Sequence, residues 1–550
     1  MVFARRSTTL LAAIIASCAM VLSLTACTSD NKTVVDGQTT VTSNSAGGVA
    51  VFTPSDGITL NQQVPLNKWA KLVPDLTKAL VDAGFKKGDI NHTTSDSLDK
   101  QSRAIQDFVV DHLSNNTTDD SGIAIAPDNM TLLVAPVVEA DASTRQYGDY
   151  VSQNLSTNDV TDEGATSDGE SSEDDSSKDD SSNTESDSTA SDEQAQAVDR
   201  LVSSLKLAKE SGMHVVLLGN SIEGYKPDAF VKFSDAQTIG KLQAEKMVSK
   251  LKLDKASKDN PKYIEVLLPY TAMDEKGNAN DSTFAQEAFR GIWQVLGSYY
   301  QKGVVESPSG TLDGKSTEND WQAVAYDAAK EGSTAKVLDK RLAKTDGQST
   351  LTRIDGIITM NDYIASEVVK ELDDLGYTGS AADINPQITI SGIVGNITGK
   401  KDLSRDAVPD PIKSPENDNA NDSSSSDDDA DKDTSASDKD RDSQWPLVTG
   451  YGAYVSNIPS IVNGKQWMTG MEDRQTIATD IAQACAKLNK DEALNSMPSI
   501  RNSEVGGVKK IPTISEPLLA VSASNLKSAL IDPDIFPWPM PVCDSYSSRR

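Results

Sequence analysis

Short apolar segments alternate with amphipathic helical patterns along most of this 550-residue chain, and that alternation limits the possible folds more than any other feature. Strands that alternate with helices predict an α/β fold, in which parallel strands are joined by helical crossovers. The first series of strands and helices consists of strands predicted at 49–53, 132–134 and 215–218 and of helices predicted at 66–81, 105–113 and 198–205. In the helix predicted at 66–81, Pro74 is expected at a kink or in the first turn.

The second half of the chain repeats the same rhythm. Two consecutive series predict two doubly wound parallel-sheet lobes joined by a hinge, and sheets of this kind bind ligands beyond the carboxyl ends of their strands. The second series consists of strands predicted at Tyr263–Leu268, Ile354–Thr359 and Ile388–Ile393 and of helices predicted at Phe284–Val295, Trp321–Leu342 and Ala365–Leu375.

The N-terminal residues have the order of a secretory signal. Arg5 and Arg6 precede an apolar run, Leu10 to Leu24, of about 15 residues, which is short of the roughly 20 that span a bilayer. Leu24-Thr-Ala-Cys27 resembles the bacterial lipobox, in which the cysteine receives a diacylglycerol after cleavage. We therefore expect residues 1–26 to be a signal peptide and Cys27 to carry acyl chains such as palmitate. The alternative is a plain secretory signal with an incidental cysteine.

The net charge of −30 is concentrated in two segments rather than spread over the chain. Residues 161–193 and 416–442 together carry −20 and are built from Ser, Asp, Asn and Thr, with almost nothing to bury. We predict solvated acidic inserts at 155–195 and 412–444, and a flexible tether at 27–47. Neither insert has the ligand spacing of an EF-hand loop. An acidic chain without a basic face also argues against nucleic-acid binding.

Catalytic and metal-binding signals are weak. The three histidines are His92, His112 and His214, and His112 lies on an apolar helix stripe, which favours a structural role. Nucleophile-elbow, zinc and Cys-x-x-Cys motifs are missing from the sequence, so we expect no catalytic residue, metal or cofactor. Cys485 and Cys543 remain once Cys27 is lipidated, and outside the cell they can form a disulfide if their Cα atoms come within bridging range.

Several stretches resemble, in order and spacing, the type I periplasmic-binding-protein fold, and within it the xylose and multiple-sugar solute-binding lipoproteins of ABC transporters. The resemblance covers most of residues 48–543. The stretches that carry it are Asp228-Ala-Phe-Val-Lys-Phe-Ser-Asp235 with Gly240 and Gln243, Ile357-Ile-Thr-Met-Asn-Asp362, Val448-Thr-Gly450, Ile461-Val-Asn-Gly-Lys-Gln-Trp-Met-Thr469 and Pro512-Thr-Ile-Ser-Glu-Pro-Leu-Leu-Ala-Val521.

The resemblance implies a clamp that closes on a small polar solute, most readily a saccharide, and is then recognised by an ABC permease. It implies an N-terminal lobe at 48–235 completed by about 470–490, a C-terminal lobe at 236–465, and an extension at 491–550 that packs on the lobes. The candidate ligand contacts follow from their positions near strand ends or, for Trp321, at the start of a second-lobe helix: they are Trp69, Asn220, Asp235, Trp321, Asn361, Asp362 and Tyr451.

Each of these residues also has a structural alternative. Trp69 lies on an apolar helix stripe, Trp321 can open a capped helix, and Asn361 and Asp362 can cap the helix that follows them. The chain also departs from the family where sugar-binding relatives carry Asp-Arg, since it has Asn220-Ser221 and so lacks the guanidinium fork. Where relatives have Gln-Asp, it has Tyr451-Gly452.

Three hypotheses follow. The first is a lipid-anchored solute-binding subunit of an ABC importer on the outer face of the cytoplasmic membrane. The second is a module that presents its ligand to a membrane sensor. The third is a surface interaction protein whose degenerate clamp no longer takes a transported ligand.

Overall fold

The computed structural model divides into two compact units, residues 1–45 and 46–550. In the first unit it describes only the paired strands β1 (Val34–Val35) and β2 (Gln38–Thr39). None of the helices in the described part of the chain is long and apolar enough to span a bilayer. In the second unit the described residues are 46–55, 65–115, 125–138, 145–156, 185–273, 280–343, 351–381, 444–533 and 535.

The first lobe, here called the N-lobe, is built on a sheet of seven described strands in the order β17-β18-β9-β7-β5-β3-β4. All neighbouring strands are parallel except β17 and β18, which form an antiparallel pair. The inner strands β3, β5, β7 and β9 are almost fully buried, as expected for parallel strands covered on both faces, whereas the edge strands β4 and β17 are largely exposed. The strands are β3 (Gly48–Pro54), β4 (Ile90–Ser95), β5 (Met130–Val134), β7 (His214–Leu218), β9 (Ala229–Lys232), β17 (Ile500–Val505) and β18 (Val508–Ser515).

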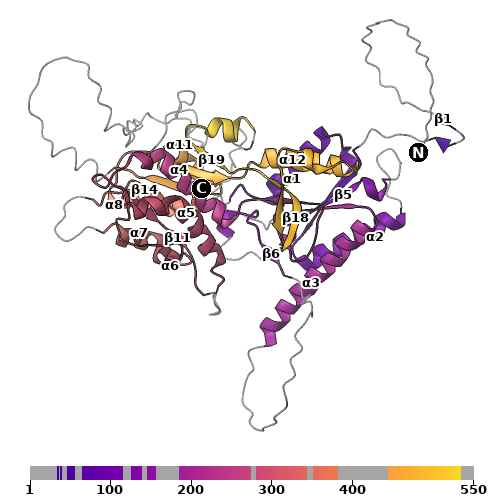
Figure 1. The fold of residues 1–550 in the computed structure, drawn as a ribbon, viewed down its shortest axis with the longest axis horizontal. Helices are drawn as coiled ribbons and strands as arrows, with labels where there is room; N and C mark the ends of the chain where they lie inside the picture. Colours follow the sequence, from indigo (N-terminus) through magenta and orange to yellow (C-terminus); the bar gives the residue numbers. More distant parts are fainter. Residues whose placement is uncertain are drawn as a thin grey trace, which may run out of the picture. The chain divides into compact units, whose positions relative to one another are not determined.

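Helices cover both faces of the N-lobe sheet (Figure 1). On one face α1 (Trp69–Asp82) and α12 (Arg474–Leu488) share a core with alternate residues of the strands. On the other face α2 (Leu98–Asn115) and α3 (Glu185–Glu210) share a second core. Pro74 lies inside α1 rather than in its first turn. A short parallel pair, β6 (Asn154–Leu155) and β8 (Ser221–Ile222), lies beside this lobe's sheet.

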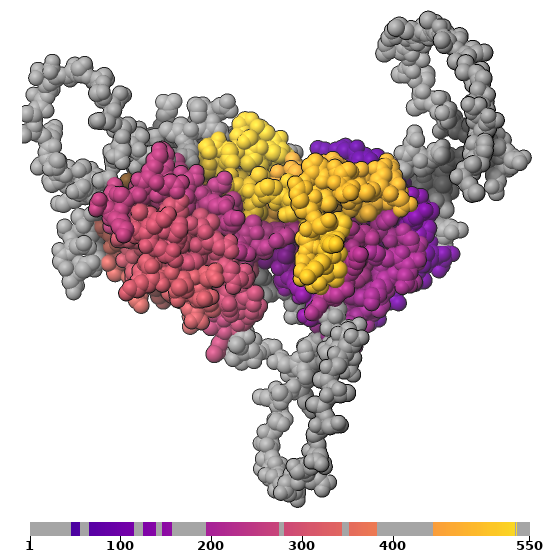
Figure 2. Space-filling view, viewed as in Figure 1, coloured from indigo at the N-terminus to yellow at the C-terminus, as the bar shows by residue number. Residues whose placement is uncertain are grey.

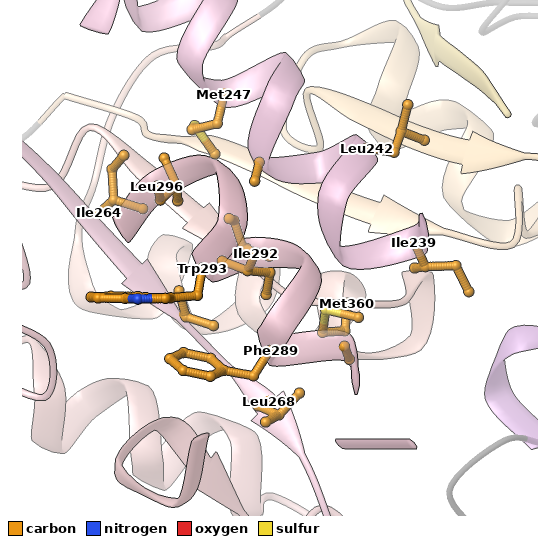
Figure 3. Packing of buried hydrophobic residues seen from close by; sticks show 14 of the residues in the cluster. Ile239, Leu242, Met247, Ile264, Leu268, Phe289, Ile292, Trp293, Leu296 and Met360 are labelled. Atoms are coloured by element: carbon orange, nitrogen blue, oxygen red, sulfur yellow. The ribbon is translucent and has the colours of Figure 1, made fainter. Parts of the chain in front are cut away.

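The second lobe, here called the C-lobe, has six described strands in the order β12-β10-β14-β15-β16-β19. Only β19 runs antiparallel to its neighbour. Figure 3 shows apolar side chains such as Ile292, Phe289 and Met360 packed together between the helices and this sheet. The strands are β10 (Lys262–Val266), β12 (Val305–Glu306), β14 (Gly356–Ile358), β15 (Leu447–Tyr451), β16 (Met468–Met471) and β19 (Leu519–Ser522).

Two helix pairs form the main layers of the C-lobe, α4 with α5 in one core and α7 with α8 in another. The short strands β11 (Leu268–Pro269) and β13 (Ala325–Tyr326) pair in parallel beyond the main sheet. The helices are α4 (Ala236–Leu251), α5 (Thr283–Gln301), α6 (Trp321–Val324), α7 (Ser333–Arg341), α8 (Asp362–Leu375) and α11 (Ile458–Val462), with a π-helical turn η8 (Lys527–Ile531) after β19.

The described chain passes between the lobes three times, from β9 to α4, from β16 to α12, and from β18 to β19. The last passage means that the C-terminal residues supply strands to both sheets, two to the N-lobe and one to the C-lobe. In Figure 2 the orange-to-yellow residues accordingly lie against both the indigo-to-magenta and the red parts of the surface. Three adjacent crossings are the arrangement expected of a hinge.

The predicted α/β architecture with two doubly wound lobes is confirmed. One predicted element is wrong, because the helix expected at Trp321–Leu342 is two helices, α6 and α7. Between them Ala325–Tyr326 pairs with β11, and Gly332 takes a left-handed φ of 70° that ends any continuous helix. The strand expected at Ile388–Ile393 lies outside the described residues, as do Cys27 and most of both acidic inserts.

Candidate ligand site at the lobe boundary

Residues of both lobes meet where the carboxyl ends of the two sheets face each other, and we call this region the lobe boundary. From the N-lobe it contains 66–69, 146–153 with Asn220, and Ser234. From the C-lobe it contains Asn361, Asp362, Tyr451–Tyr454 and Glu472. The Leu66 amide donates to the Gly452 carbonyl at 2.9 Å, which joins the two lobes through their backbones.

Asn361 and Asp362 stand between β14 and α8, where the backbone turns sharply. Met360, just before them, has a φ of 67°, an uncommon conformation for a residue with a side chain. Its carbonyl accepts from Gln243 at 3.0 Å. Asn361 caps α8 by accepting from the Ile364 amide at 2.9 Å, and its Nδ2 donates across the boundary to Gln146 Oε1 at 3.0 Å. The capping role of Asn361 therefore coexists with a contact to the other lobe.

Asp362 is fully buried and both of its carboxylate oxygens are hydrogen-bonded. Oδ1 accepts from Gln466 Nε2 at 2.7 Å, and Oδ2 accepts from the Tyr454 amide and from Thr469 Oγ1, both at 2.9 Å. Burial raises the pKa of Asp362 to about 6, although these hydrogen bonds act to lower it. Gly450 is required beside it, because a Cβ there would lie 2.2 Å from Oδ1.

Tyr451 is also fully buried, close to two of the crossings. Its hydroxyl shares a hydrogen bond of 2.5 Å with Ser234 Oγ and donates to Glu472 Oε1 at 3.3 Å. The same Glu472 oxygen accepts from the Ser234 amide at 2.7 Å. Burial raises the pKa of Glu472 above its usual value despite these hydrogen bonds. Ser234, Tyr451 and Glu472 thus link the first two crossings.

On the N-lobe side, Trp69 forms the centre of an aromatic cluster and is 2% exposed. Its ring meets Tyr150 edge-on at 5.1 Å and Phe233 edge-on at 5.7 Å, while Tyr150 and Phe233 stack at 4.8 Å. This environment is that of a core residue, which the sequence offered as the alternative to a ligand contact at Trp69.

Asn220 and Asp235 both make defined contacts with the protein. Asn220 is 2% exposed, donates to the Pro136 carbonyl at 2.9 Å and accepts from the Gln153 amide at 3.0 Å. Asp235 caps α4 through Thr238 and pairs with Lys232 at 2.9 Å. Burial acts to raise the pKa of Asp235, but these hydrogen bonds outweigh it and the pKa is lowered.

Trp321 lies apart from the other predicted contacts. It opens α6 and packs edge-on against Tyr270 at 5.1 Å, half-buried. The preceding Asp320 makes no side-chain cap on α6 and instead accepts from the Thr317 amide at 2.6 Å. The structure therefore brings Trp69, Asn220, Asn361, Asp362 and Tyr451 to the lobe boundary and places Trp321 beside β11 and β13. The ligand roles of all seven residues remain predictions.

One segment of the lobe boundary was not predicted from the sequence. It is the loop Gln146–Ser152, which follows β5 and includes the 3-10 turn η3 (Arg145–Tyr147). Tyr147 is 1% exposed, and its ring packs against Phe284 at 4.6 Å and Tyr451 at 6.2 Å. The only hint in the sequence is a pair of tyrosines, Tyr147 and Tyr150, just before a polar acidic stretch.

Three buried polar atoms at the lobe boundary have no hydrogen-bond partner of regular geometry among the described residues: Asn67 Nδ2, Tyr147 Oη and Ser152 Oγ. The Asn361 side chain, whose Nδ2 donates to Gln146, also lies within interaction distance of the Tyr147 hydroxyl. A buried polar group without a partner is costly and calls for an explanation such as a water or ligand. This boundary therefore has hydrogen-bonding capacity that the described residues leave unused.

Other features of the described residues are less suited to ligand binding. A surface groove of about 380 Å³ lies between α1 and α12, lined by Asp75, Lys78, Gln475 and Thr479 among others, and contains none of the residues of the lobe boundary. Within the described ranges, no group of three His, Cys, Asp or Glu side chains is placed to hold a metal ion. Cys485 is fully buried in the N-lobe core, while Cys543 lies outside the described residues, so their disulfide remains a prediction.

The strand orders and the three crossings are those of the type I periplasmic-binding-protein fold. This fold was implied by the sequence resemblance and is confirmed. No family model and no curated protein matches the chain.

Solved structures similar to this chain have low sequence identity to it. A carbohydrate transporter solute-binding protein from Chloroflexus aurantiacus, in complex with D-glucose, is 16% identical with a TM-score of 0.42, over 91% of this chain and 99% of that chain. An ABC transporter solute-binding protein from Clostridium phytofermentans with bound β-D-glucose is 17% identical with a TM-score of 0.43, over 89% and 98%. At this level of similarity the fold assignment rests on the topology described above, and function requires a separate argument.

Proposed function

We propose that this chain is a lipid-anchored extracellular solute-binding protein of an ABC importer, that it captures a saccharide between its two lobes, and that it carries out no chemistry. Cys27 would hold it at the outer face of the cytoplasmic membrane. A permease in the same membrane would then recognise the closed form.

One observation carries this proposal. The carboxyl ends of two mainly parallel sheets meet at a three-crossing hinge, and three buried polar atoms there find no regular hydrogen bond within the part of the chain that the structure describes. Ligands of doubly wound sheets bind at this edge, and hinge closure buries them among groups from both lobes. Amide and hydroxyl groups are suited to sugar hydroxyls, and aromatic rings to the apolar faces of a sugar ring.

The hydrogen-bonding groups at the lobe boundary also indicate which charge the ligand carries. The groups that a displaced loop would expose on the C-lobe are the Asn361 amide and the Tyr454 hydroxyl, which now bind Gln146. On the N-lobe they are Asn67 and Ser152. All four are uncharged, so a neutral saccharide suits this boundary better than an anionic solute.

A thermal-shift panel tests the proposal directly. The mature chain is heated with D-glucose, D-xylose, D-ribose and maltose at rising concentrations. Binding to the folded state alone stabilises it by RT ln(1 + [L]/Kd), about 2.7 kcal/mol at a hundredfold excess over Kd. We expect one sugar to raise Tm with this concentration dependence. A flat response to every saccharide would contradict the proposal.

The anchor is tested separately. In cells that express the full chain, Cys27→Ser should abolish incorporation of labelled palmitate and release the protein from the membrane fraction. Cys18→Ser, within the expected signal peptide, is the matched control and should leave both unchanged. Retained label in the Cys27→Ser chain would contradict lipidation at this residue.

A second function is favoured by the occupation of the lobe boundary by the chain's own loop. If Gln146–Ser152 is never displaced, the clamp is permanently closed, and the protein is a sensor or surface interaction module without a transported ligand. The flat thermal response described above is the result that this alternative predicts.

A further inference from the structure

The loop after β5 is attached firmly to the N-lobe at its second half. Asp149 pairs with Lys68 Nζ at 2.7 Å, accepts from the Trp69 amide at 3.1 Å, and donates its own amide to the Asn67 carbonyl at 2.8 Å. Tyr150 Oη donates to the Lys68 carbonyl at 2.5 Å. These contacts fix the loop to the start of α1, directly beside Trp69.

The first half of the same loop enters the C-lobe. Tyr147 belongs to the C-lobe core although it comes from an N-lobe loop, and its ring lies against Phe284 and Tyr451. The side-chain oxygen of Gln146, Oε1, accepts from Asn361 Nδ2 at 3.0 Å. The backbone carbonyl of Gln146 accepts from the Tyr454 hydroxyl at 2.7 Å. Gln146 and Tyr147 thus join the two lobes at the strand ends, where a solute would have to lie.

This contact is incompletely satisfied. The Tyr147 hydroxyl is buried beside Asn361 without a hydrogen bond of regular geometry, and two more buried polar atoms, Ser152 Oγ in the loop and Asn67 Nδ2 before α1, have no partner among the described residues. A permanent core contact would be expected to pair these groups or to use phenylalanine in place of tyrosine. A polar solute in the same place would offer hydroxyls to Asn361 and Tyr454, the two groups that Gln146 now occupies. The occupant is therefore one that a better hydrogen-bonding partner can replace.

We propose that Gln146 and Tyr147 are an internal occupant of the ligand site, which holds the lobes closed without solute and which a saccharide must displace in order to bind. Part of the binding free energy of a saccharide is spent on removing Tyr147 from the C-lobe. The observed affinity for the saccharide is therefore lower than it would be at an empty site. The displacement step rests on the proposed function, whereas closure of the solute-free protein does not.

Amide hydrogen exchange in the solute-free mature chain tests closure. The Leu66 amide reports on it, because its hydrogen bond to Gly452 crosses the lobe boundary. We expect Leu66 to be protected in the wild type and to exchange at least tenfold faster in Tyr147→Ala, while Leu132 in β5 stays unchanged and shows that the fold is intact. Tyr147→Phe keeps the ring and should keep the protection. Unprotected Leu66 in the wild type, or equal exchange in Tyr147→Ala, would overturn the proposal.

Affinity for the panel sugars tests displacement. If a sugar binds the wild type, Tyr147→Ala should bind it at least tenfold more tightly, because no occupant has to leave. Equal or weaker binding by Tyr147→Ala would show that Tyr147 does not compete. If neither protein binds any sugar, the proposed function fails, and the exchange of Leu66 still decides whether Tyr147 holds the lobes closed.

Discussion

The two sides of the lobe boundary are built in different ways. On the C-lobe side, Asp362 is surrounded by donors from three other elements, and both of its oxygens are paired. On the N-lobe side, the corresponding place is taken by the aromatic cluster of Trp69, Tyr150 and Phe233, and the side-chain atoms Asn67 Nδ2 and Ser152 Oγ have no partner among the described residues.

The difference indicates which side can change on ligand binding. A buried carboxylate with every oxygen paired is costly to disturb, since each lost partner leaves a buried group unpaired. Contacts between aromatic rings are less directional than hydrogen bonds, so one ring can give up its place to another flat apolar surface. We therefore expect the C-lobe side to be rigid and the first half of the N-lobe loop, Gln146 and Tyr147, to leave the C-lobe.

The largest effect is expected from the aromatic side. Trp69→Ala removes the centre of a buried cluster and should lower the free energy of unfolding by about 4 kcal/mol. Urea unfolding of the solute-free chain measures it. Val81→Ala in the same helix, at a side chain that is 42% exposed, is the control and should cost under about 1 kcal/mol. Equal effects at both positions would mean that the cluster does not support the N-lobe.

The paired carboxylate comes next. Asp362→Ala leaves Gln466, Thr469 and the Tyr454 amide without their acceptor and should cost about 3 kcal/mol. Asp374→Ala, at an exposed carboxylate of the same helix, should be near neutral. A loss of less than about 1 kcal/mol at Asp362 would show that this side is not the rigid one.

The pH dependence of the free energy of unfolding tests the C-lobe side of the boundary separately, because Asp362 titrates there. The pKa of Asp362 is raised to about 6 in the folded state, so the folded protein binds its proton more tightly than the unfolded chain does. The resulting stabilisation is complete below about pH 4 and is lost as the pH rises through about 6, a change of about 2 to 3 kcal/mol. Asp362→Asn cannot titrate, so its stability relative to the wild type should rise over this interval. A difference that stays constant from pH 4 to pH 7 would contradict the raised pKa.

The smallest effect is expected at Trp321, outside the lobe boundary. Its ring is half-buried on Tyr270, so Trp321→Ala should cost about 1 to 2 kcal/mol and leave saccharide affinity unchanged. A tenfold loss of affinity, measured by calorimetry with the sugar that gives the thermal shift, would restore Trp321 as a ligand contact.

Most of the fold was predictable from periodicity. Continuous apolar runs such as Val215–Leu218 became buried parallel strands, and the stripe around Ile105 became α2. The split of the helix predicted at 321–342 could not be predicted from periodicity. It depends on the pairing of Ala325–Tyr326 with β11, a tertiary contact that leaves no local signal in the sequence.

The site was only partly predictable. Residues expected at strand ends, such as Asn361 and Tyr451, lie at the lobe boundary because their position follows from topology, while their ligand roles stay predictions. The loop Gln146–Ser152 was missed, because its burial depends on both lobes and it lies next to a stretch whose composition predicts no packed structure. Sequence also does not show which polar side chains satisfy one another, so the pairing of Asp362 and the unpaired state of Asn67 appear only in three dimensions.

The position of a bound saccharide tests the central claim most directly. A crystal structure of the mature chain with the sugar that gives the thermal shift should place it between Trp69 and Asn361, with the Tyr147 ring withdrawn from Phe284. A sugar bound elsewhere, or between the lobes with Tyr147 still packed on Phe284, would contradict the account.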